Sequence, residues 1–166
     1  MFKFAGAIII VVFFSLFGIQ KTNNLHKRIN SLKEFRNMFE DLKFEIYLKN
    51  TMLPDAVKSI GNKYNNNCFI NWAVNMEGAC AEKSFCYALD SMICEFMLNK
   101  NDIGVIKCIV ASIGRLEIGS QIKRLDGGIA ALDRHINEVS AACTEKVRLY
   151  VGGSVLMGIF TVIILI

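Results

Sequence analysis

Two uncharged apolar runs at the ends of the chain constrain its fold more than any other feature. They cover Phe4–Ile19 and Val151–Ile166, and a polar stretch with helical periodicity separates them. Each run has 16 residues, of which eleven and ten, respectively, are Ile, Val, Leu or Phe. A bilayer core usually requires about 20 apolar residues, and flanking residues can supply the missing length. We therefore expect transmembrane helices at 4–20 and 149–166, on either side of a soluble domain at 21–148.

Each run has an alternative interpretation. A cleaved signal peptide could explain the first run, because Lys3 precedes it, but no Ala-x-Ala-like cleavage site follows it around Gly18 to Lys21. A C-terminal tail anchor could explain the second run, but it would leave the first one without a role. Two retained spans account for both runs.

The basic residues near the two runs predict the side of the membrane on which the domain lies. Only Lys3 lies on the outer side of a run. The domain side carries Lys21, Lys27, Arg28, Lys33, Arg134, Lys146 and Arg148. The positive-inside rule therefore predicts a cytoplasmic domain, with the lipid bilayer as its neighbour. The net charge is only +4, and no basic cluster contains interleaved aromatic residues, so we expect no nucleic-acid partner.

Helical periodicity dominates the central domain. A first apolar stripe at spacings of three and four consists of Leu25, Ile29, Leu32, Phe35, Phe39, Leu42 and Ile46. A second stripe, nearly heptad in spacing, consists of Leu125, Ile129, Leu132, Ile136, Val139, Cys143 and Tyr150. Strand-like alternation is absent from the sequence. The pattern predicts an all-α fold, an antiparallel helical bundle of about six helices between two terminal transmembrane helices.

Several local signals predict where the helices begin and end. The first helix ends near Asn50, and Pro54 opens the next one, where its missing N–H costs nothing. The Asn-rich segment at 62–67 predicts a loop. Ser120 is the expected N-cap of a last helix that continues without a break to Ile166.

No motif for catalysis, cofactor binding or metal binding is present. The sequence contains no phosphate-binding loop, H-E-x-x-H pair or G-x-S-x-G elbow. None of the six cysteines forms a Cys-x-x-Cys pair, and we expect Cys86 and Cys94 to be small buried side chains. His26 and His135 are isolated on polar helix faces and are expected to be solvated. The chain is therefore predicted to be no enzyme, with no cofactor and no metal.

Two groups of residues are candidates for contacts with other proteins or between helices. The turn that precedes the last helix, and the end of the first soluble helix, present polar side chains that could bind a partner. These candidates are Arg115, Glu117, Gln121, Arg124, Glu45 and Tyr47. An ordinary capped turn is the alternative for Arg115, Glu117 and Gln121. In the second apolar run, Ser154 and Gly158 form a small-xxx-small pair that permits close helix packing in a membrane.

Short motifs in a fixed order carry a resemblance to a known family. They are Lys3–Ala7, Phe44–Tyr47, Thr51–Ala56, Gly114, Ser120–Gln121 and Gly152–Gly153. Together they resemble the stage III sporulation protein AB family of endospore-forming bacteria over nearly the full length. Met52 stands where the family often has proline, and Glu117-Ile118-Gly119 also departs from the family pattern.

The resemblance implies a part in the channel complex between mother cell and forespore, which is needed for endospore formation. The family is similar to the inner-membrane platform domains of type II secretion and type IV pilus systems. A member would couple a secretion-type ATPase to other membrane components of the channel, from the mother-cell membrane facing the forespore. We expect a non-catalytic platform or adaptor. The alternatives are a membrane-anchored helical sensor or ligand-binding domain, and an enzyme without a recognisable motif.

Overall fold

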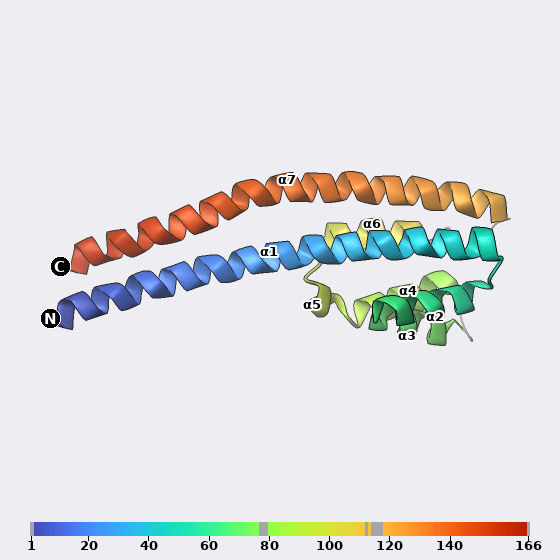
Figure 1. Ribbon diagram of the computed structural model, residues 1–166, viewed down its shortest axis with the longest axis horizontal. Helices are drawn as coiled ribbons and strands as arrows, with labels where there is room; N and C mark the ends of the chain where they lie inside the picture. The colour runs from blue at the N-terminus through green and yellow to red at the C-terminus, as the bar shows by residue number, and fades with distance from the viewer. Residues whose placement is uncertain (1, 77–79, 112, 114–117, 166) are drawn as a thin grey trace. The chain divides into compact units, whose positions relative to one another are not determined.

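A computed structural model describes residues 2–76, 80–111, 113 and 118–165 of the chain. Within these ranges the regular structure is entirely α-helical, as the sequence predicts (Figure 1). The seven helices described are α1 (Phe2–Lys49), α2 (Leu53–Tyr64), α3 (Asn67–Asn75), α4 (Ala81–Asp90), α5 (Ile93–Phe96), α6 (Lys100–Val110) and α7 (Ile118–Leu165).

The chain forms two compact units. The terminal unit comprises Met1–Ile29 and Asn137–Ile166, and the bundle unit comprises Asn30–Ile136. The bundle unit lies inside the expected domain at 21–148, whose boundaries stay a prediction. It contains all the short helices together with one part each of α1 and α7.

The apolar ends of the chain are helical, but their expected role has no structural support. Over the part of the chain that the structure describes, no helix is long and apolar enough to cross a membrane. The spans at 4–20 and 149–166 therefore stay predictions from the sequence.

Both apolar stripes are buried along the parts of α1 and α7 that belong to the bundle unit. From Leu32 to Leu42 the first stripe is fully buried, whereas Leu25, in the terminal unit, is half-buried. In α7 the positions from Leu125 to Ile136 are buried as expected. Burial of such stripes supplies the main driving force for helix pairing in water. Helical periodicity therefore identified the inward faces of both long helices.

An aromatic cluster forms the centre of the bundle unit. Its rings come from α1, α3 and α4, and neighbouring centroids lie 4.9–6.5 Å apart in tilted and edge-to-face arrangements. The members are Phe35, Phe39, Phe69, Trp72 and Phe85, all fully buried. The indole Nε1 of Trp72 donates a hydrogen bond to the carbonyl oxygen of Ala81 (2.8 Å), which satisfies its polar atom. The cluster ties α3 and α4 to α1.

The Asn-rich segment makes a shorter turn than the expected loop at 62–67. Asn62 is still in α2 and Asn67 begins α3, so only Asn65 and Asn66 separate the two helices. Asn65 adopts a left-handed conformation (φ 50°), which Asn tolerates better than most residues. The side chain of Asn66 caps α3 by accepting hydrogen bonds from the backbone N–H groups of Cys68 and Phe69. Because Asn is a good cap as well as a good turn residue, two positions suffice.

A glycine allows α2 and α3 to pack closely after this turn. A Cβ atom at Gly61 would lie 2.8 Å from Cγ1 and 2.9 Å from the backbone nitrogen of Ile70. No side chain fits there, so the two helices meet at the backbone.

The predicted end of α1 agrees with the structure, whereas the predicted start of α7 does not. Helix α1 ends at Lys49, and Pro54 lies in the first turn of α2, as predicted. The last helix, in contrast, begins at Ile118, so Ser120 lies inside it and is not its N-cap. The expected absence of a break in this helix is confirmed as far as Leu165.

Candidate partner-binding surface

Four large apolar side chains are exposed where α1 ends and α2 begins. Phe44, Tyr47, Leu48 and Met52 are between 54% and 76% exposed. The first three lie at i, i+3 and i+4, which places them on one face of α1. This face differs from the buried one, which carries Leu42 and Ile46. We call these four residues the end patch. Exposed apolar side chains that lie together on one helix face mark a binding site more often than scattered exposed residues do.

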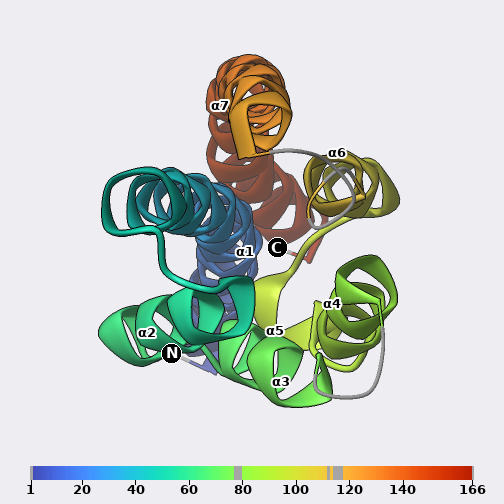
Figure 2. The same cartoon turned by 90° about the vertical axis from the view of Figure 1, so that its right-hand side faces the viewer.

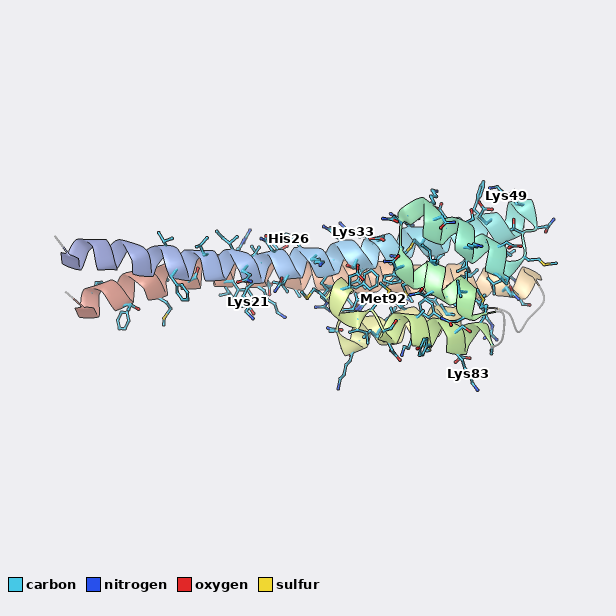
Figure 3. The ribbon with its side chains drawn as sticks, turned by 90° about the horizontal axis from the view of Figure 1, so that it is seen from below. Lys21, His26, Lys33, Lys49, Lys83 and Met92 are labelled. Carbon is cyan, nitrogen blue, oxygen red and sulfur yellow. The ribbon has the colours of Figure 1, made fainter. Side chains whose placement is uncertain are left out.

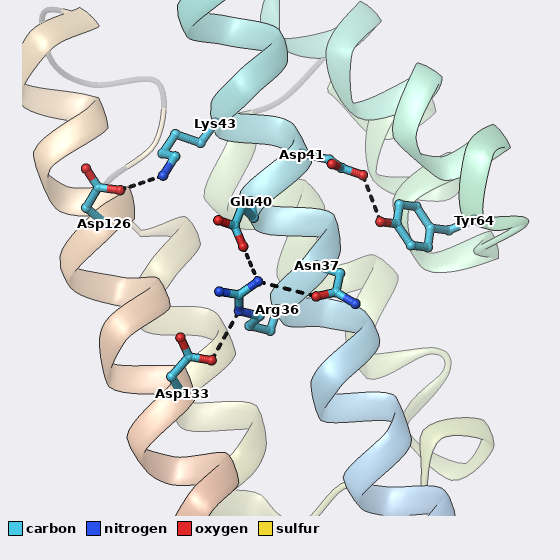
Figure 4. A network of polar contacts seen from close by, with 8 residues as sticks. All are labelled: Arg36, Asn37, Glu40, Asp41, Lys43, Tyr64, Asp126 and Asp133. Carbon is cyan, nitrogen blue, oxygen red and sulfur yellow. Dashed lines mark hydrogen bonds and ion pairs between the residues drawn. The ribbon is translucent and has the colours of Figure 1, made fainter.

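Ion pairs place the last turns of α1 beside the first turns of α7 within the bundle unit. Lys43 Nζ lies 2.8 Å from Asp126 Oδ1, and Arg36 Nε lies 3.1 Å from Asp133 Oδ1 (Figure 4). The two pairs are one heptad apart on each helix, as expected for an antiparallel seam. Arg36 also bonds to Glu40 and Asn37, which orients its guanidinium group (Figure 4).

A second polar contact joins α1 to the end of α2. Asp41 Oδ2 accepts hydrogen bonds from Lys63 Nζ and from the Tyr64 hydroxyl, each at 2.7 Å (Figure 4 shows the Tyr64 bond). Burial by itself raises the pKa of Asp41, but the two hydrogen bonds and the charge of Lys63 outweigh it and hold the pKa below its usual value. Burial and the contact with Asp41 raise the pKa of Tyr64. This contact fixes α2 on the side of α1 that carries Asp41.

The structure brings four of the six predicted contact residues to one end of the bundle unit. Glu45 and Tyr47 lie in the last two turns of α1, and Gln121 and Arg124 lie in the first two turns of α7. Tyr47 and Arg124 are exposed, whereas Glu45 and Gln121 are half-buried, and Glu45 accepts a hydrogen bond from Lys49 (2.6 Å). Figure 3 shows Lys49 at this end. The other two candidates, Arg115 and Glu117, lie outside the described residues.

Sequence reasoning selected Tyr47 but missed the other three members of the end patch. The available signal was the phase of the apolar residues. Phe44 and Leu48 do not follow the positions of the buried stripe, and therefore add a second apolar face to the last turns of α1. A bundle helix with one apolar face can bury that face in the bundle interior, whereas a second apolar face needs a further surface to pack against.

A groove lies between α6 and α7 in the bundle unit. Its volume is about 710 Å³, and its lining residues are Lys100, Asn101, Gly104, Val105, Cys108, Ile109, Arg124, Gly128 and Ala131. Helix α6 packs on α4 on one side and on the first part of α7 on the other (Figure 2). Apart from the selection of Arg124, no sequence pattern indicated this groove.

A buried carboxylate beside a histidine holds α6 against α7 at the end of this groove where α6 begins. Oδ1 of Asp102 lies 2.7 Å from Nε2 of His135, and its Oδ2 accepts the backbone N–H of Asn99. In return, the Asn99 side chain accepts the backbone N–H of Asp102, which completes a capping box. The side chain of His135 is only 17% exposed. The expectation that His135 is solvated is therefore wrong, because the sequence does not reveal that a buried carboxylate faces it.

The cysteines have no common environment. Cys68 and Cys143 are buried, Cys80 and Cys108 are exposed, and Cys86 is half-buried. The expected full burial of Cys86 is wrong, and the side chain of Cys94 lies outside the described set. Burial, with a smaller effect of the Glu95 charge, raises the pKa of the Cys68 thiol to about 12 and keeps it neutral. The part of the chain that the structure describes contains no group of three His, Cys, Asp or Glu side chains that could hold a metal ion.

In the terminal unit, α1 and α7 approach each other closely at a pair of small residues. A Cβ atom at Gly18 would lie 2.5 Å from Oγ of Ser154 and 3.1 Å from the carbonyl oxygen of Tyr150. Ser154 was selected from the sequence as a packing residue, and the structure gives it Gly18 as a neighbour. The surroundings of Gly158, the other candidate, lie outside the described set.

Comparison with known families identifies the chain. The model of one family, described as stage III sporulation protein AB, matches residues 3–166. Comparisons with curated proteins and with solved structures give no significant match. The family is one of sporulation proteins and is not a known enzyme family. The chain belongs to the stage III sporulation protein AB family.

Proposed function

We propose that this member of the stage III sporulation protein AB family is a non-catalytic membrane platform whose end patch docks a cytoplasmic secretion-type ATPase. Membership of the family supports a role in sporulation. The observation that carries the docking proposal is the exposure of Phe44, Tyr47, Leu48 and Met52 at the end of α1. The platform would belong to the channel complex between mother cell and forespore.

The chemistry of the end patch is that of a protein contact. An aromatic ring with a polar tip, such as Tyr47, covers a large contact area at a low entropic cost, and such residues carry much of the energy of many interfaces. Three of its four side chains lie on α1, whose opposite face packs in the aromatic cluster, so these three are presented on a rigid support. Lys43, one turn before Tyr47 on α1, and its ion-pair partner Asp126 add polar groups of both signs next to the patch.

Anchoring of the platform in a membrane is the second part of the proposal. It is supported by the two uncharged apolar runs of the sequence and by the close approach of Gly18 to Ser154, since small residues allow helices to pack in lipid. The excess of basic residues on the domain side favours a cytoplasmic bundle unit, and the family resemblance implies that this is the cytoplasm of the mother cell. Because α1 and α7 each belong to both units, a force on the end patch could be transmitted along these helices.

Two exposed tyrosines provide a matched test of ATPase docking. Tyr47 belongs to the end patch and is 62% exposed, whereas Tyr87 on α4 is 70% exposed and lies outside the patch. Truncation of a hot-spot tyrosine costs about 2 kcal/mol or more, or about thirtyfold in affinity. We expect Tyr47→Ser to reduce co-purification of the complex's ATPase with the full-length protein, and Tyr87→Ser to leave it unchanged.

The same pair of variants can be tested in the cell. Deletion of the gene should abolish heat-resistant spores while vegetative growth stays normal, and Tyr47→Ser should lower the spore count where Tyr87→Ser does not. Equal ATPase association and equal spore counts in the two variants would refute docking at the end patch. Recovery of the full-length protein in the soluble fraction of a cell lysate would refute the membrane anchor.

A ligand-binding domain is a second candidate function, favoured by the groove between α6 and α7. Its volume of about 710 Å³ is within the range of small-molecule sites. Such sites usually combine an apolar wall with several convergent polar groups. Here the charged side chains lie at opposite ends of the groove, which favours a longer occupant.

A further inference from the structure

The floor of the groove between α6 and α7 is apolar and consists mostly of small residues. Its central lining consists of Gly104, Val105 and Cys108 from α6, with Gly128 and Ala131 from α7. Four of these five residues are Gly, Ala or Cys, whose side chains are small. An occupant of the groove can therefore approach the backbones of both helices. Small residues of this kind allow a third helix to lie close to two others.

A glycine allows α6 and α7 to pack closely at the base of the groove. A Cβ atom at Gly128 would lie 2.9 Å from Cγ1 of Ile109. Gly104 is different, because no atom lies within 4 Å of the position that its Cβ would occupy. The space next to Gly104 is therefore part of the groove itself and serves no packing between α6 and its neighbours.

One basic side chain lies at each end of the groove. Lys100 begins α6, and Cys108, eight residues later, lies about 12 Å further along the axis. Arg124 comes one turn before Gly128, which contacts Ile109, so Arg124 lies at the end opposite to Lys100. Both side chains are exposed, and neither forms an ion pair with any residue that the structure describes. The described lining contains no acidic residue.

We propose that this groove binds an amphipathic helix of a partner protein, which places apolar side chains on the floor and acidic side chains against Lys100 and Arg124. A small anion could not neutralise two cations at this separation, whereas acidic residues about eleven positions (three helical turns, about 16 Å) apart on a helix could reach both. The helix-in-groove mode uses an apolar face together with flanking charges. The proposal goes beyond the ATPase docking proposed above, because it concerns a different surface and does not depend on that docking.

Helical peptides of defined charge test this proposal directly. The probe is a synthetic peptide of about five turns with a Leu/Ala stripe and two Glu residues eleven positions apart, stapled on its outer face because short helices are marginal in water. A control peptide carries Lys in place of both Glu residues. We expect the full-length protein in detergent to bind the acidic peptide at least about tenfold more tightly than the basic one.

Two pairs of matched variants locate the binding site. Gly104→Leu fills the groove without a clash, whereas Gly127→Leu adds the same side chain to α7 outside the groove, again with no atom within 4 Å of its Cβ. Both changes favour helix formation, so the fold is expected to persist. Lys100→Glu reverses one charge of the groove. Lys83→Glu is its control, because Lys83 points away from the bundle unit (Figure 3).

The expected result is a loss of acidic-peptide binding of about tenfold or more in Gly104→Leu and about fivefold in Lys100→Glu. The control variants should stay within about twofold. The double variant Lys100→Glu/Arg124→Glu should prefer the basic peptide, because reversed charges reverse specificity. Equal binding of both peptides, or unchanged binding by Gly104→Leu, would overturn the proposal.

Anionic lipid vesicles provide the remaining comparison. If phosphatidylglycerol vesicles bind and Gly104→Leu removes that binding too, the groove recognises a lipid surface, and the helix proposal is wrong. ATPase association of Tyr47→Ser is measured separately, so failure of one proposal leaves the other standing.

Discussion

The two halves of the bundle unit are built in different ways. In the half formed by α1, α3 and α4, five aromatic rings fill the interior, and all five are fully buried. In the half formed by α6 and the first part of α7, the buried apolar side chains are aliphatic, and the helices also meet at a glycine against Ile109 and at a carboxylate beside His135. The groove lies in this second half. We refer to them as the aromatic half and the α6–α7 half.

The difference shows how one small unit can be both stable and available for binding. Large rings bury much apolar surface and leave little space, so the aromatic half supplies stability. In the α6–α7 half, aliphatic side chains, one close glycine contact and one buried polar contact hold the helices in place, and the small residues between α6 and α7 leave a surface open. We expect mutations to be costly in the first half and to act mainly on binding or on helix ends in the second.

The largest effect is expected in the aromatic half. Phe85→Ala removes a fully buried ring from the cluster and should lower the free energy of unfolding by about 3–5 kcal/mol. Tyr87→Ala, two residues away on α4 and 70% exposed, should change it by less than about 0.5 kcal/mol. Chemical denaturation measures both values. Equal losses for the two variants would mean that the cluster does not dominate stability.

A smaller effect is expected from the buried polar contact in the α6–α7 half. Asp102→Ala removes the side-chain bond of Asp102 in the capping box of α6 together with the partner of His135, and should cost about 2–3 kcal/mol. Hydrogen exchange should show the loss of protection first in α6. Asn99→Ala removes only one bond of the box and serves as the milder control. A uniform loss of protection over all helices would contradict a local role.

Neighbouring glycines on α7 should respond in opposite directions. Gly128→Ala places a Cβ against Ile109 and should destabilise the protein by about 1–2 kcal/mol through overpacking. Gly127→Ala meets no atom and should stabilise α7 by about 0.8–1 kcal/mol, the difference in helix propensity. Thermal unfolding of both variants tests this contrast. Stabilisation by Gly128→Ala would show that α6 and α7 can separate without a penalty.

The smallest effect concerns the contact between Asp41 and the end of α2. The pKa of Asp41 is lowered in the folded protein, so ionised Asp41 adds stability above its unfolded-state pKa, which is lost as the pH falls through the folded-state pKa. Asp41→Asn should therefore be less stable than the unchanged protein at neutral pH, by less than about 1 kcal/mol. The two stability curves should converge at acidic pH. Curves that stay parallel down to low pH would exclude this linkage.

The sequence predicted those features that depend on local signals. Periodicity identified the buried faces around Phe35 and Leu132, and Pro54 identified the start of α2, because helix phase and N-terminal proline act within a few residues. The Asn-rich loop was predicted too long, since Asn serves equally as cap and as turn. The candidate surface was predicted in part, through Tyr47 and Arg124.

Those features that depend on which helix faces meet could not be predicted from the sequence. Nothing near Asp102 indicates that His135, on another helix, lies beside it, and nothing near Gly104 indicates open space next to it. The end patch likewise became visible only when Phe44 and Leu48 were found outside the core.

The sequence by itself determined the all-α fold, the inward faces of the two long helices and, through its motifs, the stage III sporulation protein AB family. The tertiary structure decided the end patch, the buried Asp102–His135 contact and the groove between α6 and α7. The physical reason is the distance along the chain over which each kind of interaction acts. Helix formation and amphipathicity act over one or two turns, whereas a binding surface depends on which side chains are left uncovered after distant segments have packed.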